Sequence, residues 1–158
     1  DTVKQLLGSR PLKLILEPGR SLVGNAGNLL TRVEFIKSNG DKQFVIVDAA
    51  MNDLMRPALY QAYHHIENAE ASDTAPFSAD IVGPICETGD FFARDREIAA
   101  QAGDLLVIRS AGAYSASMGS NYNARVKPAE VLVNGSEVKL IRRRETLEQL
   151  MQNELDCL

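Results

Sequence analysis

LLTRVEFIKSNGDKQFVIV, residues 29–47, has the sequence pattern of a β-hairpin and decides the fold class. From Leu29 to Ile36 the side chains alternate with a period of two, which places successive residues on opposite faces of a strand. Asn39-Gly40 supports the positive φ angles of a type I′ turn. The return segment, residues 44–47, is apolar on both faces, so we expect it to be a central strand.

The same pattern recurs toward the C-terminus. Residues 129–133 and 137–141 flank a second Asn-Gly, at Asn134-Gly135, and residues 104–109 form another apolar strand. Helical signals are shorter: residues 52–64 read as a helix or a set of short turns around Pro57. An amphipathic helix is expected at the C-terminus, where the apolar stripe consists of Leu147, Leu150, Met151 and Leu155. The sequence therefore predicts a mainly β fold with flanking helices.

The first 30 residues follow a different pattern. Val3, Leu6 and Leu7 have helical spacing and Gly8 is a stop signal, while residues 12–16 read as a buried strand ended by Pro18-Gly19. A helix end and one buried strand are hard to complete as a sheet, and no initiator methionine is present. This suggests the C-terminal part of a longer protein. Residues 67–80 are the most linker-like stretch.

Composition narrows the function classes. The formal net charge is −4, and the short basic run 142–144 is followed by Glu145, so a nucleic-acid partner is not expected. No apolar run approaches the roughly 20 residues that span a bilayer, and no secretory signal is visible. Cys86 and Cys157 are too far apart in sequence to suggest a disulfide framework, so we expect the cytoplasm. The adjacent His64-His65 do not converge on a helix, and we expect no metal site.

Residues 83–90, GPICETGD, carry the strongest chemical signal. They place the thiol of Cys86 beside the carboxylate of Glu87, on a loop after the apolar pair Ile81-Val82. A thiol can donate a proton near neutral pH, and a carboxylate can hold an ammonium group. The pair therefore suggests chemistry on an amine.

Three other segments have both a chemical and an ordinary interpretation. Residues 17–20 could bind a phosphate and a carboxylate, or form a plain strand-to-helix turn with a surface arginine. Arg56 and Tyr60 share a helix face, as functional groups or as a salt-bridging arginine and a half-buried tyrosine. The small-residue loop 110–123 could bring Tyr114 or Tyr122 to a ligand, or be an ordinary loop.

Taken in order, these segments closely resemble the diaminopimelate decarboxylase family. The resemblance runs from about residue 12 to the end and rests on five motifs: EPGR at 17–20, MNDLMRPALY at 51–60, GPICETGD at 83–90, GAY at 112–114 and SNYN at 120–123. It implies an N-terminal (β/α)8 barrel and a C-terminal β-barrel or sandwich domain, as in alanine racemase and ornithine decarboxylases. Residues 1–30 would be a remnant of the barrel, with 12–16 as its last strand, and residues 31–158 the C-terminal β domain.

The resemblance also implies a reaction and a role for each site residue. The family is a lyase of lysine biosynthesis that converts meso-2,6-diaminopimelate to L-lysine and CO2 with pyridoxal 5′-phosphate, in a cytoplasmic homodimer whose active site is shared between subunits. Cys86 matches the proton donor, and Glu87 the carboxylate that recognises the distal ammonium. The other matches are the cofactor-phosphate segment Glu17, Pro18, Gly19 and Arg20, of which Arg20 also binds a substrate carboxylate; Arg56 and Tyr60 at the distal end of the substrate; and Tyr114 against cofactor and substrate.

Alternatives remain at this point. Ornithine-, arginine- or carboxynorspermidine-type decarboxylases are related, but ornithine-type relatives have an aspartate in the loop of Glu87 and lack the Arg56 segment. A subunit that pairs with a separate barrel chain, or a non-catalytic β-domain used for association, is also compatible. None of Lys4, Lys13, Lys37, Lys42, Lys127 and Lys139 matches the cofactor-binding lysine of the family, so the isolated chain is expected to be inactive.

Overall fold

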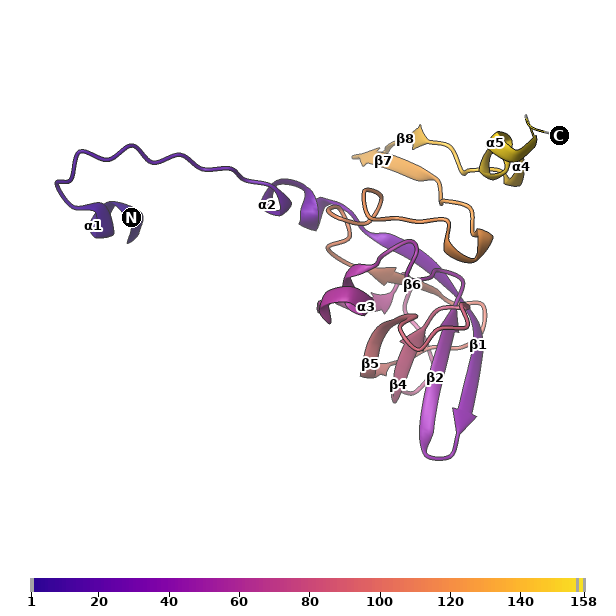
Figure 1. Ribbon diagram of the computed structural model, residues 1–158. Helices are drawn as coiled ribbons and strands as arrows, with labels where there is room; N and C mark the ends of the chain where they lie inside the picture. The colour runs from indigo at the N-terminus through magenta and orange to yellow at the C-terminus, as the bar shows by residue number, and fades with distance from the viewer. Residues whose placement is uncertain (1, 156, 158) are drawn as a thin grey trace.

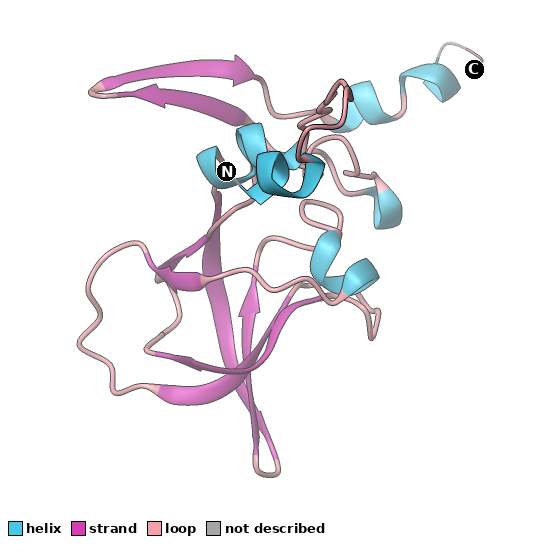
Figure 2. Ribbon diagram, turned by 90° about the vertical axis from the view of Figure 1, so that its left-hand side faces the viewer, coloured by secondary structure: helices cyan, strands magenta, loops and turns pink. Residues whose placement is uncertain are grey.

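A six-stranded sheet forms the body of the molecule in a computed structural model that describes residues 2–155 and 157. The order of its strands is β3-β6-β1-β2-β4-β5, and the sheet curls into an open barrel (Figures 1 and 2). The strands are β1 (Leu29–Asn39), β2 (Lys42–Val47), β3 (Ile66–Asn68), β4 (Phe77–Val82), β5 (Phe91–Ile98) and β6 (Leu105–Ile108), with β7 (Glu130–Asn134) and β8 (Glu137–Arg142) in a separate hairpin. The helices are α1 (Thr2–Leu7), α2 (Arg20–Val23), α3 (Arg56–Tyr60), α4 (Leu147–Leu150) and α5 (Gln152–Leu155). The predicted mainly β fold with flanking helices is confirmed.

The β1–β2 hairpin lies where the sequence predicts it, at the centre of the sheet. Val33, Val45 and Val47 are buried in the core together with residues of the neighbouring strands. The predicted turn type is wrong: Gly40 alone has a positive φ, of 60°, and Asn39 pairs with Lys42 in the ladder. The turn residues are therefore Gly40 and Asp41, and glycine at the first of them is the pattern of a type II′ turn. Gly135 repeats this geometry between β7 and β8.

The connection from β2 to β4 determines what lies at one edge of the sheet. These two strands are parallel, whereas the other paired neighbours are antiparallel. A parallel pair needs a crossover, and residues 48–76 supply it, carrying α3 and β3. Since parallel strands have their carboxyl ends at the same edge, the segment after Val47 and the loop after Val82 emerge side by side. Both segments carry predicted site residues.

The helix predicted from residues 52–64 is short, with Pro57 in its first turn as expected. Proline is tolerated there because the first N–H groups of a helix lack an intrahelical acceptor. Leu54, just before α3, is completely buried, which fixes α3 against the core. Strand β5 is an element that the sequence pattern did not predict.

The strand predicted at residues 12–16 is wrong for this chain. The segment is extended but has no ladder partner among the described residues, and Ile15 and Leu16 are 70% and 73% exposed. A strand is stable only when a neighbour satisfies its backbone hydrogen bonds. Figure 1 shows residues 2–19 as an arm that leaves the sheet body and ends in the predicted helix α1.

The C-terminal helix is also different from the prediction. It is divided at Met151 into α4 and α5, and its apolar residues Leu147, Met151 and Leu155 are exposed. Thr146 begins α4 with a capping box that includes Gln149. The preceding hairpin β7–β8 stands apart from the main sheet (Figure 2).

We expect Gly112→Ala to destabilise the domain by about 1–3 kcal/mol, the usual range for overpacking. Gly112 lies against the backbone of residues 23–27, and its N–H donates to the carbonyl of Gly24 at 3.0 Å. A Cβ at this position would overlap the carbonyl oxygen of Val23. Urea unfolding of the chain measures the difference.

Gly89→Ala is the matched control, since a Cβ there meets only the sulfur of Met51 at 4.0 Å. Its free energy of unfolding is expected to stay within about 0.5 kcal/mol of the native value. Equal effects of the two substitutions would contradict the packing described for Gly112.

Candidate functional site

Three segments that are distant in sequence bring four of the predicted site residues together. The guanidinium carbon of Arg56 lies 5.9 Å from the ring centroid of Tyr60 and 5.7 Å from that of Tyr114. A Cβ on Gly19 would lie 3.7 Å from the hydroxyl of Tyr114. The start of α2, helix α3 and the loop after β6 thus form one group, which we call the Arg56 cluster: Gly19, Arg56, Tyr60 and Tyr114.

The backbone in this cluster holds an uncommon conformation. Tyr114 has a φ of 62°, in the left-handed region that non-glycine residues rarely adopt. Such residues concentrate at ligand sites, where the surrounding structure maintains the strain. The ring that faces Arg56 is therefore carried by a residue in this rare conformation.

The remaining residues of the predicted phosphate segment lie at the junction of the arm and α2. Glu17, Pro18 and Arg20 are exposed, and Arg20 opens α2 as the sequence suggests. The methylene Cγ of Arg20 lies against Gly24, and the residue as a whole is exposed. This turn presents an exposed cationic side chain at a helix start, where the backbone also favours an anion.

Cys86 and Glu87 lie on a tight loop after β4. The loop is closed by hydrogen bonds from Glu87 N to Ile85 O, at 2.8 Å, and from Asp90 N to Glu87 O, at 3.1 Å. Both side chains are exposed, and Cys86 is a free thiol. The Glu87 carboxylate accepts a hydrogen bond from the hydroxyl of Tyr122, which raises the pKa of that tyrosine because the carboxylate favours the protonated phenol.

In this chain the predicted site is divided into two groups. Within residues 2–155 and 157, no hydrogen bond, ion pair or ring contact joins Cys86 or Glu87 to the Arg56 cluster or to Arg20. Cys86 and Glu87 form one group, and the Arg56 cluster forms the other.

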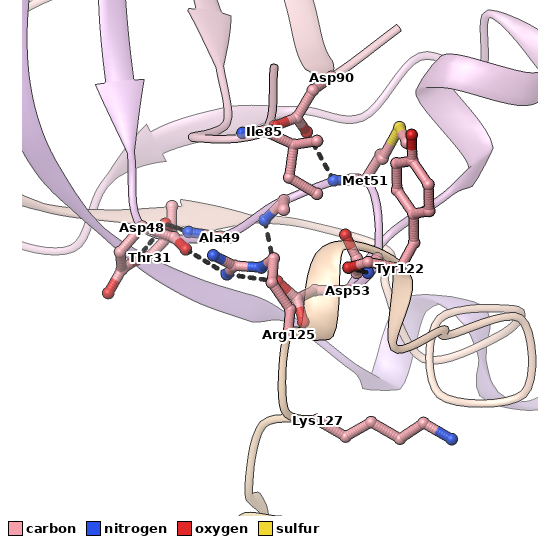
Figure 3. Close-up of polar contacts among 12 residues, drawn as sticks. Thr31, Asp48, Ala49, Met51, Asp53, Ile85, Asp90, Tyr122, Arg125 and Lys127 are labelled. Carbon is pink, nitrogen blue, oxygen red and sulfur yellow. Dashed lines mark hydrogen bonds and ion pairs between the residues drawn. The ribbon is translucent and has the colours of Figure 1, made fainter. Parts of the chain in front are cut away.

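Asp90 ties the two parallel strand ends together. It is only 3% exposed, and its two carboxylate oxygens accept hydrogen bonds from Met51 N and Ile85 N, each at 2.7 Å (Figure 3). Gly83 makes room for it, since a Cβ there would overlap the carboxylate. Burial raises the pKa of Asp90, and the two backbone N–H groups oppose that shift. One buried side chain therefore fixes both the Cys86 loop and the segment that leads to Arg56.

A second polar group supports the same edge, on residues that sequence reasoning did not assign to the site. Arg125 donates to the carbonyl of Asp48 at 2.7 Å and lies 3.7 Å from the carboxylate of Asp53 (Figure 3). Asn52, which is buried, donates to the carbonyls of Ser120 at 3.0 Å and Tyr122 at 2.9 Å. The only available signal was the presence of Asn52 and Asp53 within the motif at 51–60. Their partners lie about 70 residues away and leave no local pattern.

Comparison with known proteins decides the family. Residues 15–112 match the description "Pyridoxal-dependent decarboxylase, C-terminal sheet domain". The chain belongs to this family. The match includes the whole Cys86–Asp90 loop and three residues of the Arg56 cluster, Gly19, Arg56 and Tyr60, and it ends two residues before Tyr114.

Named relatives give a consistent activity. The chain is 72% identical over 156 residues to diaminopimelate decarboxylase of Neisseria meningitidis serogroup B, which covers 99% of this chain and 38% of that protein. It is 56% identical over 152 residues to the enzyme of Pseudomonas aeruginosa, covering 96% of this chain and 37% of that protein. The chain thus spans less than two-fifths of the length of these relatives.

Solved structures agree with these relatives. Diaminopimelate decarboxylase from Helicobacter pylori complexed with L-lysine superposes with a TM-score of 0.88 at 41% identity, covering 99% of this chain and 39% of that one. The enzyme from M. jannaschii in complex with L-lysine superposes with a TM-score of 0.86 at 45% identity. The match covers 97% of this chain and 35% of that one. Within the described residues, no helix is long and apolar enough to cross a membrane.

We expect Asp90→Asn to lower the free energy of unfolding by about 1–3 kcal/mol, because an amide nitrogen would face a backbone N–H donor that loses its acceptor.

The loss of stability in this variant should depend on pH. Since the folded pKa of Asp90 lies above its ordinary value of 3.8, the folded state binds the proton more tightly than the unfolded chain. The stability that the folded state gains from binding this proton is fully present below pH 3.8 and is lost as the pH rises through the folded pKa of Asp90. The difference in stability between native and variant should therefore grow as the pH is lowered through this window.

Denaturant unfolding at a series of pH values measures this difference. Asp41→Asn is the control, because Asp41 lies exposed in the β1–β2 turn. A stability difference that stays constant or shrinks on acidification would contradict the buried position of the Asp90 carboxylate.

Proposed function

We propose that the chain supplies the C-terminal part of a pyridoxal 5′-phosphate-dependent carboxy-lyase that converts meso-2,6-diaminopimelate to L-lysine and CO2 in lysine biosynthesis. The observation that carries the proposal is that Arg56 lies within about 6 Å of the rings of Tyr60 and Tyr114, with Gly19 beside the Tyr114 hydroxyl. An exposed Cys86–Glu87 pair lies on the loop that follows the neighbouring parallel strand. The names of relatives at 72% and 56% identity support the same substrate.

The charges of the site match a substrate with two amino-acid ends. The distal end of diaminopimelate is a zwitterion, so its recognition needs a cation for the carboxylate and an anion for the ammonium. Arg56, with Tyr60, supplies the first and Glu87 the second. The alternative, an ornithine-type decarboxylase, acts on a substrate that ends in a bare amine, which would leave Arg56 without a carboxylate to bind.

The residues around Gly19 fit the phosphate end of the cofactor. Gly19 brings backbone close to the Tyr114 hydroxyl, and Arg20 adds a positive charge at the start of α2. In the proposal Glu17, Pro18, Gly19, Arg20 and Tyr114 form this part of the cofactor site, and Arg20 also binds a substrate carboxylate. When bound, the cofactor withdraws the electrons released by loss of CO2.

The protein must then orient the reacting end and return one proton to it. Arg56 and Glu87 hold the distal end, so that the carboxylate to be lost is fixed in direction. The exposed thiol of Cys86 donates the proton to Cα, and the adjacent Glu87 places the substrate with respect to that thiol. The hydrogen bonds between this loop and Asp90 fix the backbone that carries these two side chains.

Domain organisation and assembly are part of the proposal. Residues 1–30 would be the remnant of an N-terminal (β/α)8 barrel and residues 31–158 the C-terminal β domain. The separation of the Cys86 loop from the Arg56 cluster within one chain supports an active site shared between two subunits of a homodimer. Two free, exposed cysteines are compatible with the cytoplasm.

The function is tested in a chimera in which this chain replaces the matching segment of the Neisseria meningitidis enzyme. We expect release of CO2 from diaminopimelate, and we expect Cys86→Ala to reduce kcat by about 10²–10⁴-fold, the usual contribution of a general acid. Cys157→Ala, which removes the other exposed thiol, should leave kcat unchanged.

An inactive chimera that is folded would contradict the proposal. Full turnover by Cys86→Ala would instead favour the alternative of a non-catalytic β domain used for association.

The isolated chain should form no adduct with pyridoxal 5′-phosphate. No hydrogen bond or ion pair in the described residues joins a lysine to the Arg56 cluster, and Lys42 is bound to Asp80 at 2.8 Å. The visible absorption spectrum of the chain mixed with the cofactor checks this. A strong stoichiometric band from a lysine adduct would show that the chain carries its own cofactor lysine.

A further inference from the structure

We propose that Tyr122 is a positioning residue that holds one oxygen of the Glu87 carboxylate and directs the other to the distal ammonium of the substrate. The inference rests on the proposed function for the role of Glu87. It adds a residue that neither the motif roles nor the comparisons assign.

The contact that carries the inference is the hydrogen bond from the Tyr122 hydroxyl to Glu87 Oε1. The two residues lie 35 positions apart, on loops that follow different strands. Glu87 is exposed, and a free glutamate side chain on a loop would sample many rotamers. The phenol restricts this carboxylate to one orientation before a ligand arrives.

Tyr122 is itself held by a buried side chain. The Nδ2 of Asn52, a residue only 3% exposed, donates to the carbonyl of Tyr122 at 2.9 Å and to that of Ser120 at 3.0 Å. The two following residues, Asn123 and Ala124, have φ values of 58° and 53°. Left-handed backbone at an alanine is uncommon and persists only where the surroundings fix it. The direction of the Tyr122 side chain is therefore built into the loop.

A neutral donor suits this task better than a cation. Arginine or lysine would also fix the Glu87 carboxylate, but it would cancel the charge that attracts an ammonium group. The carboxylate raises the pKa of Tyr122, which keeps the phenol protonated and able to donate. Glu87 thus retains its full negative charge while losing its rotational freedom.

Tyr122→Phe in the Neisseria meningitidis chimera tests the inference, because phenylalanine keeps the ring and removes only the donor. We expect the KM for diaminopimelate to rise about 10-fold, the loss of one hydrogen bond to a charged group, with a smaller change in kcat. Inhibition by 2-aminopimelate, which keeps the distal carboxylate but lacks the distal ammonium, should be unchanged. Tyr63→Phe is the matched control, since Tyr63 packs its ring on Arg96 away from Glu87.

Two results would overturn the inference while the proposed function stands: unchanged KM for diaminopimelate in Tyr122→Phe, or equal weakening of both ligands. Should the unsubstituted chimera be inactive, the proposed function fails, and the contact is tested in the isolated chain. The groups that face the phenol of Tyr122 are Glu87 and Cys86. In a pH titration followed by tyrosine absorbance, one tyrosine should ionise at a higher pH in the native chain than in Glu87→Gln. Identical titration curves of the two chains would overturn the contact itself.

Discussion

The buried carboxylate of Asp90 is the constraint on which the candidate site depends. The parallel pairing of β2 and β4 brings two chain segments to one edge of the sheet, but pairing alone does not fix loops beyond the last ladder residue. Asp90 does so by accepting the N–H groups of Met51 and Ile85. Burying a charge is costly unless it is hydrogen-bonded, and two charge-assisted bonds offset part of that cost here, so that the pKa of Asp90 is still raised. The orientation of Cys86 and of the segment before Arg56 follows from this one side chain.

Local chemistry made part of the structure predictable. Both hairpins were predictable from strand segments on either side of an Asn-Gly pair. In each hairpin the asparagine is paired in the strand ladder, so glycine takes the first turn position and the turn type differs from the one predicted. Arg56 and Tyr60 contact each other as their spacing on a helix predicts. Strand β5 was not recognised because its alternation is interrupted: Asp95 has a φ of 47° and sits at an irregularity in the β4–β5 register. A bulge of this kind is stabilised by tertiary contacts, here from Asp95 N to Asp80 at 2.9 Å, which no local pattern shows.

An apolar sequence pattern predicts that a segment will be buried, but it does not identify the residues that cover it. Residues 12–16 read as a buried strand, the β7–β8 segment as a second hairpin and residues 147–155 as an amphipathic helix. In the described part of the chain most of their apolar side chains are exposed, and Leu150 is half-buried. Figure 1 places the first on the arm and the other two beyond the main sheet. The core residues, by contrast, have partners within the sheet itself, and there the sequence pattern and the structure agree. The prediction of burial at residues 12–16 was wrong because no described residue covers their apolar side chains.

The charged groups of the candidate site are held in a different way from those of two surface ion pairs. Arg109 and Glu67 bind each other at 2.6 Å, and Arg142 and Glu130 at 2.8 Å, so each pair neutralises its own charge. Arg56 is instead placed against two tyrosine rings, and Glu87 against a phenol. Aromatic partners orient a charge without cancelling it, and the edge of a guanidinium stacked on a ring stays free to bind a carboxylate. A fold that fixes one cation and one anion in this way leaves both available for a ligand that carries the opposite pair.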